Sequence, residues 1–164
     1  MYGENGYGND GRSYALMTDS DGNYYVYSFT APTAYTSDPI KHYARKIDLS
    51  VATDFAKASH YAFFSNQMII LYSVGNVLYA YDYNRNDVKS IDMGAEITYL
   101  AMEHQSSLTP TDFVVATYSN SEKGIVRKYS IADNVNSIEI TPHAREVWKT
   151  GLKVVRVLWK YSNY

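Results

Sequence analysis

The chain carries many short stretches in which large and polar side chains alternate, separated by turn residues. Residues 25–29 and 79–83 have a large side chain at every second position, the pattern of a strand with one buried face. Residues 68–72 and 113–117 are continuously apolar, which is typical of strands buried on both faces. An all-β chain is therefore predicted, with these strands: 13–18, 24–30, 43–49, 61–65, 67–74, 77–83, 88–93, 97–103, 112–119, 124–131, 136–141 and 152–161.

A short sequence motif occurs three times, each time at the end of a run of predicted strands. The tetrapeptides KIDL, SIDM and SIEI contain Ile47, Ile91 and Ile138, at spacings of 44 and 47 residues. A period in the forties with only strands inside it is typical of propeller blades. Gly94 and Gly151 each precede an opening strand, which completes a unit of four strands.

The pattern predicts a propeller-type array of about three four-stranded antiparallel blades in a domain of residues 13–164. Residues 1–12, rich in Gly, Asn and Tyr, are expected to be a flexible N-terminal segment. Because propellers have about four to eight blades, the array is either part of a larger propeller or one of two paired copies. In a monomer, residues 154–159 of a closing strand, 152–161, would add to the edge near residues 14–18, or both edges would stay exposed. In two paired copies, a homodimer through edge strands would be closed by exchange of the final strands. The blades are assigned to residues 13–50, 58–93 and 94–141.

Composition narrows the class of partner. The 164 residues carry a net charge of −2 without a basic cluster, so nucleic acid is not an expected partner. There is no cysteine, which excludes disulfides, thiolate metal sites and a cysteine nucleophile. No apolar run reaches the roughly 18 residues of a membrane span, and no signal-peptide pattern is present. The 18 tyrosines are interpreted mainly as sheet packing.

Motifs for metals and catalysis are weak. The segment Asp19-Ser20-Asp21-Gly22-Asn23 places oxygen-bearing side chains at alternate positions, as a calcium loop does, but Thr30 stands where the later glutamate would be. We interpret it as a turn and predict no bound metal and no cofactor. No nucleophile elbow, phosphate loop or dinucleotide fingerprint occurs. One set of acids recurs at the last strands and is expected to face solvent: Asp48, Asp92 and Glu139.

The candidate ligand-binding residues lie in the predicted links between blades, at residues 51–60 and 141–151. An aromatic side chain with polar neighbours suits a carbohydrate or peptide site. The alternative for the tryptophan is that it packs the join between blades. The candidates are His60, His143, Arg145 and Trp148.

Four segments resemble the C-terminal part of the PKD-like putative lipoproteins of Bacteroidetes. These are residues 75–79 (GNVLY), 97–99 (ITY), 115–118 (VATY) and 151–155 (GLKVV), within a resemblance that covers roughly residues 14–161. The resemblance implies a cell-envelope protein, at the outer membrane or in the periplasm. It brings no catalytic residues.

Three functions remain open from the sequence. The favoured hypothesis is a non-enzymatic binding or scaffolding module of the bacterial cell envelope, with a glycan or an envelope protein as partner. One alternative is a fragment of a propeller-type glycoside hydrolase or polysaccharide lyase, whose acids would converge at the rim. Another is a purely structural domain that presents other domains. Glycan binding without turnover favours the first, and product release favours the second.

Overall fold

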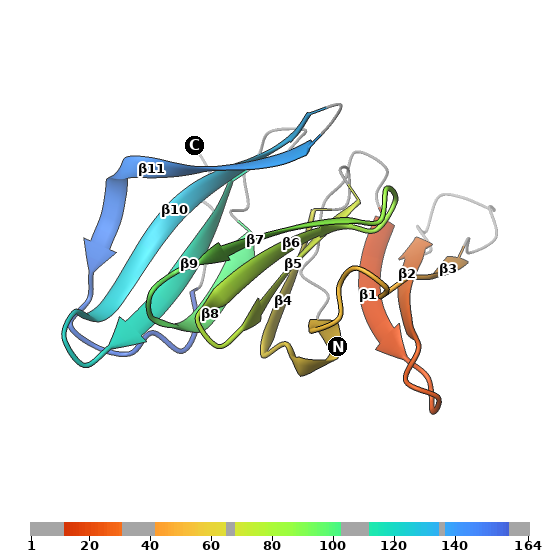
Figure 1. The fold of residues 1–164 in the computed structure, drawn as a ribbon, viewed down its shortest axis with the longest axis horizontal. Coiled ribbons are helices and arrows are strands. Elements are labelled where there is room, and N and C mark those ends of the chain that lie inside the picture. The colour runs from red at the N-terminus through yellow and green to blue at the C-terminus, as the bar shows by residue number, and fades with distance from the viewer. Residues whose placement is uncertain (1–11, 31–41, 65–67, 103–111, 135–136, 158–164) are drawn as a thin grey trace, which may run out of the picture.

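A computed structural model describes residues 12–30, 42–64, 68–102, 112–134 and 137–157 (Figure 1). In these ranges every helix or strand except one short helix is a β-strand, which confirms the all-β part of the predicted fold class. The one helix there has three residues, and no helix in the described part is long and apolar enough to cross a membrane. The elements are β1 (Arg12–Thr18), β2 (Tyr24–Thr30), β3 (His42–Lys46), η1 (Phe55–Lys57), β4 (His60–Phe64), β5 (Ile69–Val74), β6 (Val77–Asp82), β7 (Asp87–Asp92), β8 (Glu96–Met102), β9 (Asp112–Ser119), β10 (Lys123–Asn134) and β11 (Ser137–Lys149).

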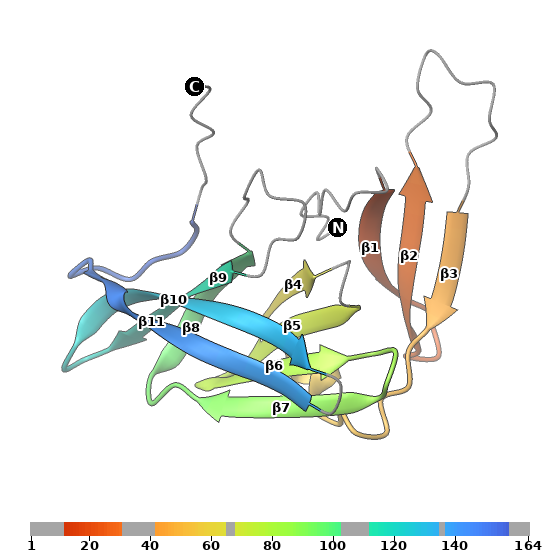
Figure 2. The same ribbon diagram turned by 90° about the horizontal axis from the view of Figure 1, so that it is seen from above.

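The strands form three antiparallel sheets in which neighbours in sequence are neighbours in space. The first sheet has the order β1-β2-β3, the middle sheet β4-β5-β6-β7 and the last sheet β8-β9-β10-β11. The middle sheet lies between the other two (Figure 2). Tight turns allow this order; Gly75, for example, adopts a φ of +59° between β5 and β6.

The C-terminal part differs from the sequence-based prediction in two places. The strand predicted to end at residue 141 continues to Lys149, so residues 141–149 are not a link between blades. The strand continues because β11 bulges around Pro142, which is tolerated at an edge strand that needs no further ladder bond. Residues 152–157 of the predicted closing strand lie in no sheet, and residues 158–161 fall outside the described residues. Residues 1–11 of the predicted N-terminal segment also fall outside them.

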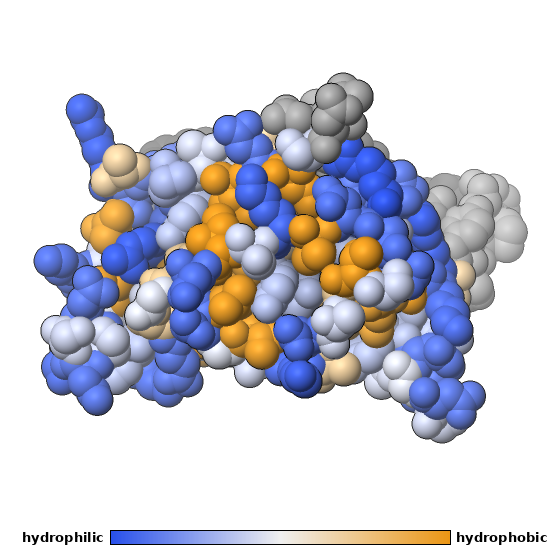
Figure 3. All heavy atoms as spheres, in the orientation of Figure 1, coloured by the Kyte–Doolittle hydropathy of each residue, from blue (hydrophilic) through white to orange (hydrophobic). Residues whose placement is uncertain are grey.

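Strand β5 of the middle sheet is buried on both faces, which explains why its sequence is largely apolar. Ile69 and Leu71 pack toward the last sheet, whereas Ile70 and Tyr72 pack toward the first sheet. Apolar atoms gather at the centre of the molecule's face in Figure 3, with hydrophilic atoms toward both ends. Several apolar residues of the strands β5, β8 and β9 are at most 2% exposed, among them these five: Ile69, Leu71, Leu100, Val114 and Ala116.

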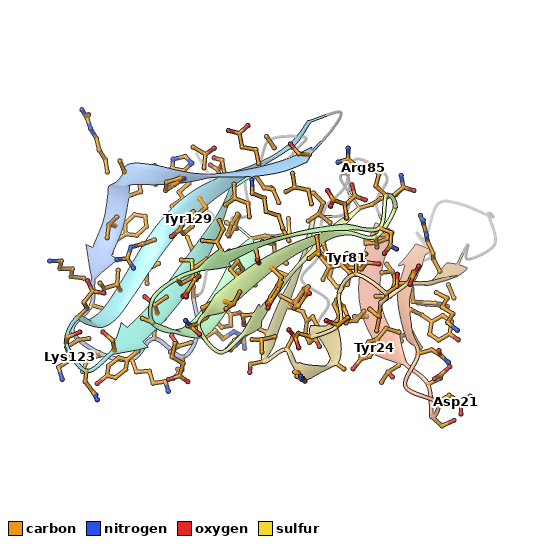
Figure 4. The ribbon with its side chains drawn as sticks, in the orientation of Figure 1. Asp21, Tyr24, Tyr81, Arg85, Lys123 and Tyr129 are labelled. Carbon is orange, nitrogen blue, oxygen red and sulfur yellow. The ribbon has the colours of Figure 1, made fainter. Side chains whose placement is uncertain are left out.

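Aromatic side chains fill the seam between the first and middle sheets. Phe55 of η1 is fully buried, and four tyrosine rings have centroids 5.0–6.2 Å from its ring. Tyr24 and Tyr81 come from the two sheets on either side of it (Figure 4). This arrangement accounts for part of the high tyrosine content as sheet packing. The four are Tyr24, Tyr61, Tyr72 and Tyr81.

Polar contacts complete the same seam. The hydroxyl of Tyr81 donates to the backbone carbonyl of Asp48 and lies 3.0 Å from Oδ1 of Asn86. Arg45 of β3 donates to the carbonyl of Tyr83, 3.3 Å away, and its guanidinium lies 5.5 Å from the centroid of that ring. The first sheet is therefore held to the β6–β7 turn by directional bonds as well as by apolar packing.

Candidate functional site

One row of side chains crosses the last sheet on the face turned away from the middle sheet. Trp148 lies opposite Val126, Val126 opposite Ala116, and Ala116 opposite Tyr99. Residues directly opposite one another share a face of the sheet. Val115, on the other face, packs into the core shared with the middle sheet. We call the face that carries the row from Tyr99 to Trp148 the outer face of the last sheet.

A cluster of charged and polar side chains lies on the outer face, where β11 bulges. Lys128 Nζ is 3.3 Å from Asp112 Oδ2 and 3.4 Å from Glu146 Oε2. Ser130 Oγ is 2.5 Å from Asp112 Oδ1 and 2.5 Å from His143 Nε2. His143 Nδ1 is 3.4 Å from Glu146 Oε1. We call these five residues the bulge cluster.

The bulge of β11 brings the cluster together. The register of β10 with β11 shifts between Arg127, which pairs with Val147, and Tyr129, which pairs with Pro142. The extra residues of β11 allow His143 and Glu146 both to reach side chains of β10, and His143 also approaches Asp112 of β9. The side chains of Asp112 and Lys128 are only 13% and 12% exposed, so their ion pair is sheltered from solvent.

The direction of the hydrogen bonds follows from the charge of Asp112. Burial alone would raise the pKa of this carboxyl, but the hydrogen bonds from Ser130 and Lys128 and the nearby charges hold it below its ordinary value. At neutral pH Asp112 is therefore an acceptor only. The single hydroxyl proton of Ser130 goes to Asp112, and His143 Nε2 must donate to Ser130.

This direction decides what the cluster can do chemically. A serine, a histidine and an acid in line have the composition of a hydrolase triad, in which the histidine accepts the proton of the serine. Here Ser130 gives its proton to Asp112, so His143 is not placed to accept it. The arrangement is a charge network that fixes the bulge, rather than an activated nucleophile.

Three of the four candidate residues lie on β11, whereas the fourth, His60, lies on another strand. Trp148 is 48% exposed on β11, three residues from Arg145, which is also exposed, and His143 belongs to the bulge cluster. His60 lies elsewhere: its ring centroid is 6.0 Å from that of Tyr99, at the opposite edge of the last sheet. Three strand spacings separate Tyr99 from Trp148 across the sheet, roughly 14 Å. His60 is therefore not part of the same site.

Sequence reasoning missed four members of the bulge cluster: Asp112, Lys128, Ser130 and Glu146. The available signal was weak. Lys128 and Ser130 stand at alternate positions of their strand, on either side of the buried Tyr129, and Asp112 stands two residues before the buried Val114. Such alternation places side chains on one face but does not say which strands share that face.

The acidic segment at residues 19–23 forms a hydrogen-bonded turn between β1 and β2. Oδ1 of Asp19 accepts from the backbone of Asp21 and Asn23, and Oδ2 accepts from the side chains of Asn23 and Tyr25. The bonds from Asn23, followed by those from Tyr25 and Asp21, lower the pKa of Asp19 to about 2. Within the described residues, no group of three or more His, Asp or Glu side chains is placed to hold a metal ion.

The recurring acids at the strand ends are all exposed. Asp48 and Asp92 each accept a backbone hydrogen bond of 2.8 Å from the residue two positions later, Ser50 and Gly94 respectively. Such bonds end a strand and begin a turn. Glu139 lies on the exposed edge of β11.

Comparison with known proteins yields no relative of this chain. No protein-family model matches it, and neither a curated protein nor a solved structure does so.

Proposed function

We propose that this chain is a propeller-type module of a bacterial envelope protein that binds a glycan without cleaving it. The order of the strands supports the propeller-type arrangement, because each sheet is a meander and the next sheet begins after its last strand. The turns out of β7 and β11 are also alike: Gly94 has a φ of +71° and Gly151 a φ of +70°. The resemblance to PKD-like lipoproteins supports the envelope location.

The surface around Trp148 carries the proposal of a glycan. Its indole is 48% exposed and stands on the same face as Lys128 and Glu146 of the bulge cluster. Sugars present apolar C–H faces beside hydroxyl groups. An aromatic ring next to charged hydrogen-bonding groups complements both parts. Because the bulge cluster fixes this stretch of β11, the ring is pre-organised and little conformational entropy is lost when a ligand binds.

The direction of the Ser130 proton supports binding rather than catalysis. The bulge cluster contains the residue types of a hydrolase, but the hydroxyl of Ser130 donates its proton to a hydrogen bond with Asp112. The same groups offer Lys128, Glu146 and His143 as hydrogen-bonding partners at the rim of the site. Their side chains range from 12% to 40% exposed, so a ligand could reach part of the cluster.

Glycan-array screening followed by calorimetry on the best ligand tests this function. Trp148→Ala should weaken binding about 2- to 12-fold, because an aromatic contact of this kind contributes roughly 0.5–1.5 kcal/mol. Val147→Ala is the matched control, because Val147 is similarly exposed (41%) but points to the other face. Equal effects of the two variants would contradict the site. Release of shortened products from the bound polysaccharide would contradict the non-enzymatic function.

A further inference from the structure

Within the described residues, the first sheet has three strands, whereas the other two sheets have four. The middle sheet opens with β4 and the last sheet with β8, and each of these pairs with the strand that follows it. The first sheet opens with β1, which corresponds to β5 and β9, the second strands of the other sheets. On the side of β1 away from β2, no strand of the described part of the chain pairs with it. Within the described residues, this backbone edge is therefore unpaired and can accept another strand.

Residues 152–157 are a segment that resembles the opening strand of a sheet but pairs with no sheet in the described part of the chain. They follow Gly151, whose φ of +70° matches the +71° of Gly94 ahead of β8. Their sequence, LKVVRV, is rich in β-branched residues. Leu152 and Val155 are 75% and 79% exposed, which is unusual for apolar side chains.

The start of this segment is anchored on the outer face of the last sheet. The amide of Thr150 donates to the carbonyl of Gly124, 2.9 Å away, and Lys153 Nζ lies 3.6 Å from Glu96 Oε2. The segment therefore crosses the sheet from the β10 side to β8, as a link to a following sheet would. Within the described residues, no following sheet receives it.

We propose that residues 152–157 of one copy pair with β1 of a second copy, and that the exchange is reciprocal in a two-fold dimer. The backbone groups of this unpaired segment can form hydrogen bonds with the unpaired backbone groups at the edge of β1. Two copies bring together six sheets, within the usual range of about four to eight for a closed ring, whereas three are too few. This inference rests on the propeller-type arrangement proposed above, but not on the glycan.

The β8–β9 pairing gives the expected register. Tyr99 stands five residues after Gly94 and pairs with Ala116, three residues before the end of β9 at Ser119. The equivalent positions are Arg156, five residues after Gly151, and Ala15, three residues before the end of β1 at Thr18. Arg156 of one copy should therefore lie opposite Ala15 of the other. Facing strand residues have Cα atoms about 4.5–5.5 Å apart, within disulfide range.

Cysteine cross-linking tests the pairing directly, because the chain has no cysteine of its own. The variant carrying both Ala15→Cys and Arg156→Cys is oxidised and run on a non-reducing gel. A mixture of the two single variants is treated in the same way. We expect disulfide-linked dimers in both cases. The control combines Ala15→Cys with Val51→Cys, because Val51 is also exposed (41%) but lies outside the proposed pairing, and it should remain monomeric.

Sedimentation of the unmodified chain and of Val155→Pro completes the test. Proline removes a strand hydrogen bond, and Val155 makes no contact in the core, so the variant should fold but sediment as a monomer. A monomeric unmodified chain, a Val155→Pro variant that remains dimeric, or a disulfide formed only within one chain would each overturn the dimer. A disulfide within one chain would do so while leaving the propeller-type arrangement and the glycan proposal standing.

Discussion

Gly124 is the position where a single added methyl group should have the most specific effect. A Cβ atom there would lie 1.6 Å from the backbone oxygen of Leu152 and 2.2 Å from Oγ1 of Thr150. Both distances are far below a van der Waals contact, and the first involves backbone. Gly124→Ala should therefore displace the segment that crosses the outer face of the last sheet, without disturbing the core on the other face.

The size of the effect follows from the bonds that this displacement breaks. Thr150 donates its amide to the carbonyl of Gly124 over 2.9 Å and its hydroxyl to the oxygen of Leu152 over 2.7 Å. Each such bond contributes about 0.5–1.5 kcal/mol. Alanine in a strand interior recovers about 0.5–1 kcal/mol relative to glycine. The net loss for the anchored segment is about 0.5–2 kcal/mol.

Amide hydrogen exchange at Thr150 measures this loss locally. A loss of this size lowers the protection of that amide roughly 2- to 30-fold, whereas amides of β5 should be unaffected. Asn120→Ala, an exposed change in the same β9–β10 hairpin, is the control and should leave Thr150 unchanged. Unchanged protection in Gly124→Ala would refute the close approach of the segment to β10.

Three further predictions concern the core, the seam and the first turn. Ile69→Ala should lower the free energy of unfolding by about 2–5 kcal/mol in denaturant titrations, because Ile69 is fully buried between two sheets; an unchanged midpoint would contradict that core. Tyr81→Phe should lower the free energy of unfolding by about 1–3 kcal/mol in the same assay, because it removes the hydroxyl that donates to the backbone carbonyl of Asp48; no loss would show that the seam does not need this bond. Carboxyl NMR should give Asp19 a pKa of about 2, below its ordinary 3.8, so its stabilising contribution is complete above about pH 4 and is lost as the pH falls through about 2; an ordinary pKa would contradict the bonded turn.

The sequence predicted the strands well where burial or turns fixed their pattern. Residues 69–74 and 77–82 were found because apolar runs and the Gly75 turn are local signals. The end of β11 was missed because Pro142 reads as a strand breaker unless the strand is known to lie at an edge. Whether a strand lies at an edge depends on the pairing of distant segments, which a single sequence does not record.

The candidate site was less predictable, because it too depends on the pairing of segments that are distant in the sequence. Trp148 and His143 stood out as an aromatic side chain and a titratable side chain close together in sequence. Asp112, which lies 3.7 Å from His143, stands 31 residues before it in the sequence, and only the pairing of β9 with β10 and of β10 with β11 brings the two together. His60 was grouped with them because its predicted link seemed equivalent, yet it lies across the sheet.

The bulge cluster connects the stability of the last sheet to the proposed binding surface. An edge strand as long as β11 would, if regular, leave a flat row of unpaired backbone groups open to other chains. The bulge interrupts that row, and Lys128 holds it in place by bridging Asp112 and Glu146. The same bridge sets the position of the stretch that ends in Trp148. A feature that protects the edge from aggregation thus also holds an exposed aromatic ring in a fixed position, so that less conformational entropy is lost when a ligand binds.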